Sequence, residues 1–515
     1  MGPRAGALKT QDPERGNQAV TGQAPDQCRP RGKDPTMSTK MMQFVTLDRA
    51  MPTKRAAGER GRDFDEIYQP FQVDAAKTQS SRCEQCGIPF CQIGCPLANN
   101  IPDWLNLAAS GRTEEAYRVS QATNTFPEIC GRICPQDRLC EGSCVLEQSR
   151  HGTVTIGAVE KHLTDTAWEQ GWVSAPKPKA ETGRSVAIIG AGPAGLAAAD
   201  RLRRMGHAVH VYDRYDRAGG LLVYGIPNFK LDKDVVARRT DLLASGGIVF
   251  HADFEVGRDA TLDELQQKHD AVLIATGVYK TRRVDLPGAN LGGVVQALDY
   301  LTTSNKNGLG DSVEAFENGT LNAKDKNVVV IGGGDTAMDC VRTAIRQGAK
   351  SVKCLYRRDR ANMPGSRAEV ANAEEEGVEF VWLAAPEAFL NEGDRVTGVR
   401  AYRIHLGVPD ASGRQAPEPI PDSSFMVDAD MVIKALGFEP EDIPSLFGAD
   451  DLKVTRWGTL TVDPNTMMTA RDGVFAAGDI VRGASLVVWA IREGRDAADG
   501  IDAYIQKQAA KAAAE

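Results

Sequence analysis

Eight of the eleven cysteines lie between residues 83 and 144, where they form two runs of four. Each run contains a Cys-Pro step, Cys95-Pro96 in the first and Cys134-Pro135 in the second. Two metal clusters with four cysteine ligands each require eight thiolates, and two neighbouring clusters can conduct single electrons. The runs therefore predict a domain built around metal sites. The first run consists of Cys83, Cys86, Cys91 and Cys95, and the second of Cys130, Cys134, Cys140 and Cys144.

Three interpretations of the two cysteine runs are possible: iron–sulfur clusters, structural zinc sites and disulfide bonds. Bacterial ferredoxins bind clusters through a similar run that ends in Cys-Pro, although the spacing here is looser (x2, x4, x3, then x3, x5, x3). Two structural zinc sites match the thiolate count, since C-x2-C pairs are common in zinc sites. A disulfide framework is disfavoured, because no secretory signal opens the chain and the rest is typical of a cytosolic nucleotide-binding protein. The Cys-Pro steps favour iron–sulfur clusters over zinc.

Length and charge restrict the domain number and the classes of partner. A chain of 515 residues exceeds what one hydrophobic core usually serves, so we expect two to four domains of roughly 100–200 residues. The net charge of −8 and the lack of a basic stripe argue against a nucleic-acid partner. The apolar stretch at residues 186–199 is too short and glycine-rich to enter a membrane. Residues 1–36 show no apolar periodicity and are expected to be a leader or a loose tail.

A first glycine loop follows a strand-type segment at residues 186–190 and opens a helical segment at 196–205. The next strand, at 207–212, ends in Asp213, 23 residues after the first glycine. This is the dinucleotide-binding fingerprint in its full context: the glycines allow a tight turn and close approach of a pyrophosphate, and the acid binds ribose hydroxyls. The loop residues predicted to bind the cofactor are Gly190, Gly192, Pro193, Ala194 and Gly195.

A second strand of the same type begins 142 residues after the first and carries a second glycine loop. Its following strand, at 351–356, ends in Arg357-Arg358 instead of an acid. A carboxylate there would repel a 2′-phosphate, whereas a guanidinium group binds it, so the pair favours NADPH over NADH. The alternative of a merely solvated pair stays open, because Asp359 follows directly. The loop residues predicted to bind NADPH are Gly332, Gly334, Asp335, Thr336 and Ala337.

Three further motifs are similar to those of the two-dinucleotide flavoprotein reductases. In that family the first unit binds FAD, the second unit is inserted within the first and binds the nicotinamide nucleotide, and a Gly-Asp pair near the C-terminus contacts the flavin nucleotide. The matching residues are Gly219, Gly220 and Leu221, then Ala275, Thr276 and Gly277, and finally Gly478 and Asp479.

The resemblance implies an α/β fold with two Rossmann-like dinucleotide-binding domains, the second inserted in the first, preceded by an α-helical domain with a double 4Fe-4S cluster. The implied limits are 37–182 for the helical domain, 183–286 with 441–515 for the FAD domain, and 287–440 for the NADPH domain. Periodicity predicts helices at 101–110, 113–121 and 154–168.

The order of the motifs resembles one family closely, the small (β) subunits of bacterial NADPH-dependent glutamate synthase. The likeness covers roughly residues 41–505 and includes Cys-Glu-Gln-Cys-Gly-Ile-Pro-Phe-Cys at 83–91 and Ile-Cys-Gly-Arg-Ile-Cys-Pro at 129–135. Related proteins are the N-terminal half of dihydropyrimidine dehydrogenase and ferredoxin-dependent NADPH transhydrogenases. Dihydropyrimidine dehydrogenase has one glutamine ligand, whereas this chain offers cysteine at all eight positions, which favours the glutamate synthase branch.

The family resemblance implies a cytoplasmic electron-input subunit that oxidises NADPH through FAD and two 4Fe-4S clusters. It would feed a large (α) subunit, in a hetero-oligomer, that makes L-glutamate from L-glutamine and 2-oxoglutarate. Two alternatives remain: a flavoprotein subunit of a ferredoxin-dependent NADPH transhydrogenase or pyrimidine reductase, and a zinc-stapled adaptor in which FAD is structural. Transfer between cofactors needs little acid–base chemistry from the protein, so no catalytic residue is predicted.

The ferredoxin precedent also predicts how the ligands divide. Cys95, displaced by the Pro96 turn, is expected to join the cluster of the second run, and Cys144 to return to the cluster of the first. Elsewhere, the acidic run at residues 374–376 is interpreted as a solvated helix face.

Overall fold

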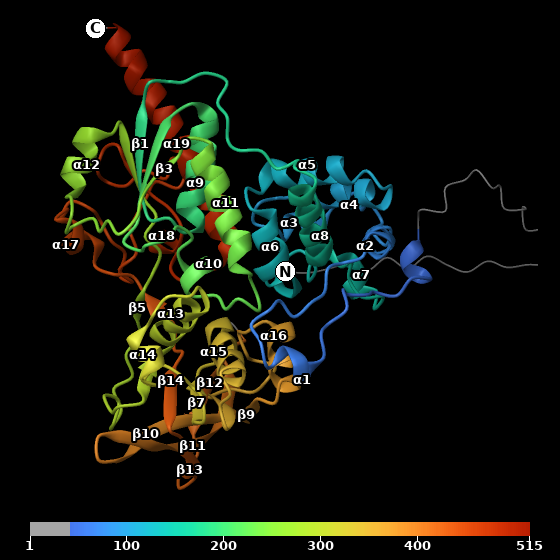
Figure 1. Ribbon diagram of the computed structural model, residues 1–515, viewed down its shortest axis with the longest axis vertical. Helices are drawn as coiled ribbons and strands as arrows, with labels where there is room; N and C mark the ends of the chain where they lie inside the picture. The colour runs from blue at the N-terminus through green and yellow to red at the C-terminus, as the bar shows by residue number, and fades with distance from the viewer. Residues whose placement is uncertain (1–41, 412, 515) are drawn as a thin grey trace, which may run out of the picture. The chain divides into compact units, whose positions relative to one another are not determined.

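The structure, a computed structural model, describes residues 42–411 and 413–514 (Figure 1). The leader or loose tail expected at residues 1–36 lies outside them. Helices come first along the chain, and two parallel sheets flanked by helices follow. Within the described residues, no helix combines the length and the apolar character that crossing a membrane requires.

The N-terminal part, residues 42–172, is helical, and the cysteine runs lie in its short helices and in the turns between them. In α4 (Ile101–Ala109) apolar residues recur at helical spacing, so Trp104 and Leu105 are buried together. The Trp104 indole N–H donates to Asn99 Oδ1 over 2.8 Å, which satisfies the polar atom of this buried ring. The other elements are η1 (Gln43–Val45), α1 (Ala57–Arg60), α2 (Val73–Ser80), α3 (Phe90–Ile93), α5 (Thr113–Thr123), α6 (Pro127–Ile133), η2 (Gln136–Arg138), α7 (Val145–Gln148) and α8 (Ile156–Glu169).

The first sheet has five parallel strands in the order β16-β4-β1-β2-β3. Successive side chains of a strand point to opposite faces, so Ile188 belongs to the core on one face and Ile189 to the core on the other. The strands are β1 (Ser185–Ile189), β2 (Ala208–Tyr212), β3 (Val249–His251), β4 (Ala271–Ile274) and β16 (Val474–Ala476). With the helices that cover it, this sheet forms the first unit.

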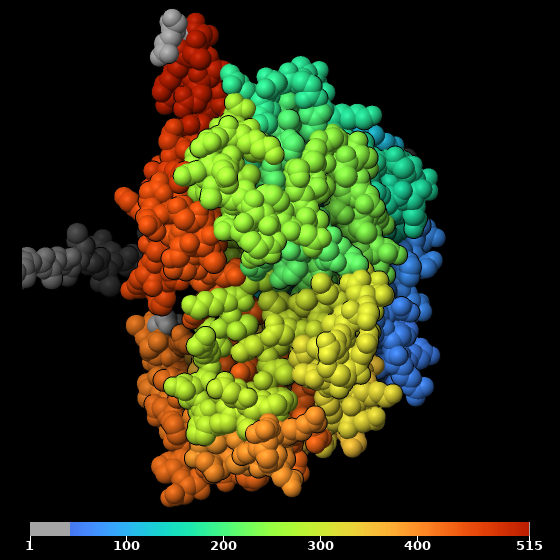
Figure 2. Space-filling model, turned by 60° about the vertical axis from the view of Figure 1, so that its left-hand side comes forward, coloured from blue at the N-terminus to red at the C-terminus, as the bar shows by residue number. Residues whose placement is uncertain are grey.

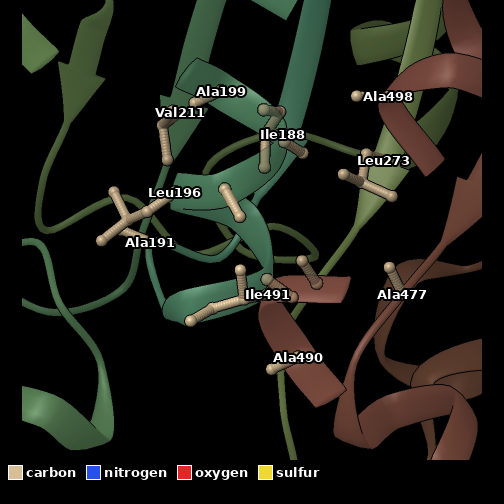
Figure 3. Close-up of a cluster of buried hydrophobic side chains, with 14 of the residues drawn as sticks. Ile188, Ala191, Leu196, Ala199, Val211, Leu273, Ala477, Ala490, Ile491 and Ala498 are labelled. Atoms are coloured by element: carbon tan, nitrogen blue, oxygen red, sulfur yellow. The ribbon is translucent and has the colours of Figure 1, made fainter. Parts of the chain in front are cut away.

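The core on the Ile188 face includes side chains of α9 (Pro193–Met205) and α19 (Val487–Ala514), some of which Figure 3 shows. The two helices pack closely: a Cβ added to Gly494 of α19 would lie 2.1 Å from the carbonyl oxygen of Ala194. Glycine is therefore required at this crossing. The remaining helices of the unit are α10 (Leu221–Tyr224), α11 (Lys233–Ser245), α12 (Leu262–Lys268), α17 (Ile443–Phe447) and α18 (Asp479–Arg482).

The second sheet is also parallel, in the order β6-β14-β7-β8-β9, and forms the second unit. Helices cover one face, whereas an antiparallel layer containing Phe389 and Val399 covers the other. The parallel strands are β6 (Val294–Gln296), β7 (Asn327–Ile331), β8 (Ser351–Tyr356), β9 (Glu379–Trp382) and β14 (Met431–Lys434). The helices are α13 (Ala297–Gly308), α14 (Glu314–Glu317), α15 (Asp335–Arg346) and α16 (Arg367–Glu375). The antiparallel strands are β10 (Ala384–Glu392), β11 (Arg395–Pro409), β12 (Gln415–Pro419) and β13 (Phe425–Asp428).

A two-stranded ribbon, β5 (Lys280–Thr281) paired with β15 (Phe438–Glu439), carries the chain from the first unit to the second and back. Because β16 completes the first sheet only after this return, the second unit is inserted in the first. The predicted fold class, two Rossmann-like units nested in this way after a helical part, is confirmed. The predicted domain limits at residues 37, 183, 287 and 441 stay predictions.

Three histidines gather on one face of the first sheet. The ring nitrogens His210 Nδ1 and His251 Nε2 lie 3.1 Å apart, and His269 Nε2 is 3.0 Å from the Tyr212 hydroxyl. Burial and the charge of Lys268 lower the pKa of all three rings, and the neighbouring histidines lower those of His251 and His269 further, that of His269 to about 4. All three rings are therefore neutral in the folded protein near pH 7.

Acid should accordingly destabilise the first unit. A histidine whose pKa falls on folding binds more protons in the unfolded chain, so stability decreases as the pH falls from about 6.5 toward 4. For His269 alone, the loss between pH 7.5 and pH 5.5 should be about 1 kcal/mol. Urea midpoints at both pH values measure it, and His269→Gln should reduce the pH dependence. The matched control His405→Gln changes an exposed histidine paired with Glu418 and should leave it unchanged.

Candidate functional site

A cavity of about 950 Å³ is lined by all three parts of the chain: the N-terminal part and both units. Its position follows from the folds, because the carboxyl ends of parallel strands are where ligands bind in such sheets. Most of the residues predicted to bind FAD, and two of those predicted to bind NADPH, line it together. They are Gly190, Gly192, Pro193, Ala194, Asp213, Leu221, Ala275, Thr276, Gly277, Asp335, Thr336, Gly478 and Asp479.

The first glycine loop leaves room for a cofactor at its centre. A Cβ on Gly190 would lie 2.4 Å from the Ala275 carbonyl oxygen, and one on Gly195 would lie 2.0 Å from the Gly190 carbonyl oxygen. A Cβ on Gly192, by contrast, would meet no atom within 4 Å. Gly192 is also the N-cap of α9, so the free N–H groups of that helix face the same space, as an anionic pyrophosphate requires.

The polar groups around this loop suit a dinucleotide. Asp213 is held by the backbone, with Oδ2 accepting from Ala191 N over 2.6 Å and Oδ1 from Tyr215 N over 2.8 Å, and burial raises its pKa. Each oxygen retains a lone pair for a ribose hydroxyl. The Thr276 hydroxyl is buried without a hydrogen-bond partner among the described residues. Asp479 lines the cavity and accepts from the Ser485 hydroxyl over 2.7 Å. The residues therefore fit the cofactor that the fingerprint predicts.

Gly219 and Gly220, which were also predicted to bind FAD, contact the first glycine loop without lining the cavity. The Gly219 N–H donates to the Ala191 carbonyl over 2.8 Å and so fixes the loop. A Cβ on Gly220, whose φ is +54°, would lie 3.0 Å from the Gly192 α-carbon.

The second glycine loop repeats this geometry. A Cβ on Gly332 would lie 2.3 Å from the Ala435 carbonyl oxygen, just as Gly190 meets Ala275. Gly334 is the N-cap of α15, and a Cβ there would again meet nothing within 4 Å, while Ala337 is buried in the core. Asp335 is already engaged: its carboxylate accepts from Ser366 N over 2.8 Å and pairs with Arg138 of the N-terminal part at 3.1 Å.

The two arginines after β8 differ in their surroundings. Arg357 is exposed, whereas Arg358 has Nε and Nη2 buried with no hydrogen-bond partner in the described part of the chain. Asp359 instead accepts from the backbone N and the side-chain amide of Asn362, at 2.9 and 2.8 Å. Buried polar groups usually have hydrogen-bond partners, and guanidinium N–H groups are strong donors to phosphate. Nε and Nη2 of Arg358 are therefore suited to bind a phosphate group.

Sequence reasoning missed an ion pair that joins the two units at the cavity. Lys230 of the first unit lies 2.8 Å from Asp339 of α15 and 3.7 Å from Glu369 of α16, and all three residues line the cavity. Burial raises the pKa of Asp339 to about 6, against the opposing charge of Lys230. The available signal was the place of Asp339, seven residues after Gly332 and about one helical turn into α15.

The eight clustered cysteines fall into two groups. Cys83, Cys86, Cys91 and Cys144 line one small cavity. The other group consists of Cys95, Cys130, Cys134 and Cys140, which lie close enough for each to affect the thiol pKa of others in the group. The predicted division would need this grouping, and the assignment of the cysteines as ligands of two clusters stays a prediction; the ten described cysteines are all free thiols.

The donor set fits clusters better than single ions. Among residues 42–411 and 413–514, no three His, Cys, Asp or Glu side chains lie close enough together to hold one metal ion. In a tetrahedral zinc site all four sulfurs bind one metal atom, with Zn–S distances of about 2.3 Å. In a 4Fe-4S cluster each cysteine binds a different iron, so the four sulfurs lie further apart. Four thiols around a shared space, as Cys83, Cys86, Cys91 and Cys144 are, suit a cluster better than a single ion.

The second cysteine group borders the large cavity. Cys134 and Pro135 line it, and Arg492 of α19 donates to the Pro96 carbonyl over 3.0 Å. Cys95 also packs against the core that contains Cys144, so the second group adjoins the first. The order in space is therefore dinucleotide cavity, second cysteine group, first cysteine group.

The N-terminal part and the two nucleotide-binding units each match a known protein family. Residues 60–172 match the family described as dihydropyrimidine dehydrogenase domain II, 4Fe-4S cluster, and residues 184–494 match pyridine nucleotide-disulphide oxidoreductase. In fold, the chain is similar to FprA of Mycobacterium tuberculosis, solved in complex with NADPH, with a TM-score of 0.55, 19% identity, and coverage of 64% of this chain and 86% of that one. The class is thus an oxidoreductase that combines a 4Fe-4S domain with two nested nucleotide-binding units.

Closer relatives narrow this class. The glutamate synthase [NADPH] small chain of Azospirillum brasilense is 69% identical over 471 residues, which are 91% of this chain and 97% of that one. The putative oxidoreductase AegA of Escherichia coli is 47% identical over 472 residues, which are 91% of this chain and 71% of that protein. The chain belongs to the family of glutamate synthase [NADPH] small chains.

Proposed function

We propose that the chain is the electron-input subunit of glutamate synthase in the cytoplasm. It would oxidise NADPH through FAD and two 4Fe-4S clusters and feed a large (α) subunit that makes L-glutamate from L-glutamine and 2-oxoglutarate. The observation that carries the proposal is the cavity between both glycine loops, which the second cysteine group borders. When bound, the nicotinamide gives up a hydride, FAD takes up the electron pair, and the clusters carry the electrons singly.

The residues of the first unit would bind and orient FAD. The open space at Gly192 and the N-terminus of α9 would receive the pyrophosphate of FAD. Asp213 and Asp479 would accept hydrogen bonds from the hydroxyl groups of FAD. Val487, the first residue of α19, lines the cavity. The partial positive charge at that helix end would stabilise the electron-rich end of the reduced flavin.

The residues of the second unit would present NADPH to the same cavity. The loop at Gly334 would receive its pyrophosphate, and Arg357 and Arg358 its 2′-phosphate. The Lys230–Asp339 pair lines the same cavity as residues of both loops and would keep the two units in contact there.

An apolar surface beside the first cysteine group would meet the large subunit. Ile88, Phe90 and Ile93 lie between the cysteines of that run and are 62%, 49% and 68% exposed. Exposed apolar side chains grouped in this way are typical of protein-binding surfaces. In a hetero-oligomer this surface would bring the first cluster close to the acceptor of the large subunit.

Glutamate formation should require the partner. The purified, cofactor-loaded chain should reduce artificial acceptors with NADPH but form no glutamate from L-glutamine and 2-oxoglutarate, because its described residues are accounted for by the cluster part and the two nucleotide units. Addition of a large (α) glutamate synthase subunit should start glutamate formation. Glutamate formed by the chain alone would overturn the proposal.

A second candidate is a flavoprotein subunit that serves another acceptor, because the similar protein AegA is named a putative oxidoreductase rather than a glutamate synthase chain. If the chain reduces artificial acceptors but the large subunit does not restore glutamate formation, a ferredoxin or a pyrimidine reductase becomes the expected acceptor. Reduction of added ferredoxin by NADPH then tests it.

A further inference from the structure

A loop of the N-terminal part reaches across to the second unit. Residues 53–69, here called the strap, close on themselves: Lys54 and Tyr68 form an antiparallel bridge, and Arg55 N donates to the Ile67 carbonyl over 2.9 Å. In Figure 2 the blue N-terminal segment, which includes the strap, lies against the yellow second unit. The strap is therefore an ordered element that connects two parts of the molecule.

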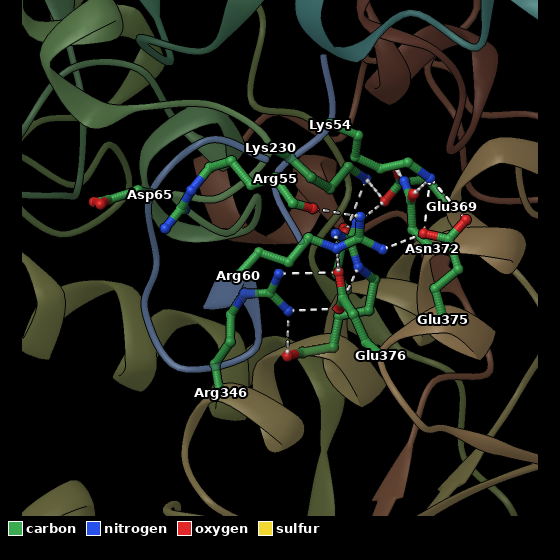
Figure 4. Close-up of polar contacts among 12 residues, drawn as sticks. Lys54, Arg55, Arg60, Asp65, Lys230, Arg346, Glu369, Asn372, Glu375 and Glu376 are labelled. Carbon is green, nitrogen blue, oxygen red and sulfur yellow. Dashed lines mark hydrogen bonds and ion pairs between the residues drawn. The ribbon is translucent and has the colours of Figure 1, made fainter. Parts of the chain in front are cut away.

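Arg60 is the residue by which the strap enters the second unit. Its side chain is 1% exposed, and its Nε lies 2.9 Å from Oε1 of Glu376, which is 0% exposed (Figure 4). Its Nη2 lies 2.5 Å from Glu375 Oε2. Glu376 also binds Arg342 and Arg346 of α15, at 2.8 and 2.6 Å. The interpretation of residues 374–376 as a solvated helix face is thus wrong for Glu376, because three arginines surround it.

The same network includes the first unit. Asn228 Nδ2 donates to the Phe64 carbonyl of the strap over 3.1 Å, and the Phe64 and Phe229 rings pack at 6.2 Å. The guanidinium groups of Arg342 and Arg346 lie over the Phe229 ring at 4.5 and 3.9 Å. The next residue is Lys230, which pairs with Asp339 in the cavity. One short segment of the first unit thus contacts both the strap and α15.

The orientation of the two units depends on contacts of this kind. The ribbon of β5 and β15 is the covalent link between them, and units joined by short linkers move relative to each other unless an interface fixes them. A planar guanidinium group that binds two carboxylates fixes direction as well as distance. A buried ion pair contributes little net stability compared with apolar packing, so fixing geometry is the role such a pair serves best.

We propose that Arg60 is a positioning residue for NADPH oxidation: through Glu375 and Glu376 it holds the second unit in the orientation in which its nucleotide meets the first unit. The inference rests on the proposed function, since it concerns the transfer between the two nucleotides. It makes the cluster-containing N-terminal part necessary for the first step of the reaction as well as for the last.

The test compares Arg60→Met with the matched control Arg55→Met in the full-length, FAD- and cluster-loaded chain. Arg55 belongs to the same strap but pairs with Asp63 within it. FAD and iron content should equal that of the wild type in both variants. In stopped-flow experiments with NADPH, Arg60→Met should lower the rate constant of flavin bleaching by about 10- to 100-fold at full amplitude, since small misplacement of reacting groups has effects of this size. Arg55→Met should stay within about twofold of the wild type, because its pair closes the strap locally.

Hydrogen–deuterium exchange without NADPH provides a readout that does not depend on turnover. Arg60→Met should raise exchange in α15 and α16, and Arg55→Met should not. If Arg60→Met loses its cofactors, Arg60→Lys is measured instead. Lysine keeps the positive charge but lacks the planar guanidinium group that binds two carboxylates. Its rate constant should be lower than those of the wild type and Arg55→Met, by less than tenfold. An unchanged rate constant, or a reduced amplitude at an unchanged rate constant, would overturn the inference. Failure of NADPH to bleach the wild-type flavin would instead overturn the proposed function.

Discussion

Replacement of Cys144 by alanine should remove one of two clusters and spare the other. Cys144 lies in the second run, 49 residues beyond Cys95 in the sequence, yet it lines a cavity with Cys83, Cys86 and Cys91. Cys95→Ala should remove the other cluster, because Cys95 neighbours Cys134 and Cys140. Each variant should contain about four irons and four sulfides per chain, compared with about eight of each in the wild type, as two 4Fe-4S clusters require.

Metal and sulfide analysis with electron paramagnetic resonance of the reduced protein measures this result. The two variants should lose different signals. Cys28→Ala is the thiol control, because Cys28 belongs to neither run, and it should retain all the iron. Loss of the same signal from both variants would contradict the division of ligands, and about two zinc ions in the wild type would contradict the clusters themselves.

Loss of the second cluster should also have the larger effect on electron transfer. Its cysteine group borders the dinucleotide cavity through Cys134, so it has to receive electrons before the first cluster does. Cys95→Ala should therefore slow reoxidation of the flavin by acceptors that react at the clusters, while NADPH still bleaches the flavin at the wild-type rate.

Local patterns in the sequence predicted the elements that carry the site. Apolar residues at helical spacing predicted helices at 101–110 and 154–168, and the structure has α4 at Ile101–Ala109 and α8 at Ile156–Glu169. The glycine loops were recognisable because their geometry depends on residues a few positions apart: Gly195 has to lack a Cβ because the Gly190 carbonyl lies 2.0 Å from where it would be. Such constraints are short-range, so one sequence contains them.

Contacts between distant segments were not predictable in this way. Arg60 and Glu376 are 316 residues apart, and nothing in the surrounding sequence marks either as buried. The acidic run at 374–376 was interpreted from its charge alone, and its charge does not show which distant residues pack against it in the folded chain. The Lys230–Asp339 pair was missed for the same reason, since its members come from different units.

Neutral replacement of Arg357 and Arg358 together should make the chain a poorer NADPH oxidase while leaving NADH oxidation nearly unchanged. Charge-assisted hydrogen bonds to a phosphate contribute roughly 1.5–3 kcal/mol, so the KM for NADPH should rise by about 10- to 100-fold. NADH lacks the 2′-phosphate, so its KM should change little. Arg358→Gln alone should account for most of the effect, because its Nε and Nη2 are the buried atoms that lack a partner among the described residues.

The control for this pair is Arg360→Gln. Arg360 lies two residues further along and is paired at the surface with Glu374 at 2.8 Å, so it should alter neither KM, which separates a specific phosphate contact from a general loss of positive charge. Initial rates with both nucleotides, at fixed ionic strength, measure the ratio, since surface charge effects depend on salt. Equal losses with NADPH and NADH would mean that the arginines support the fold of the second unit rather than bind the 2′-phosphate. A loss for NADPH alone would assign nucleotide specificity to the two residues that follow β8, where Rossmann-like units bind the ribose of their cofactor.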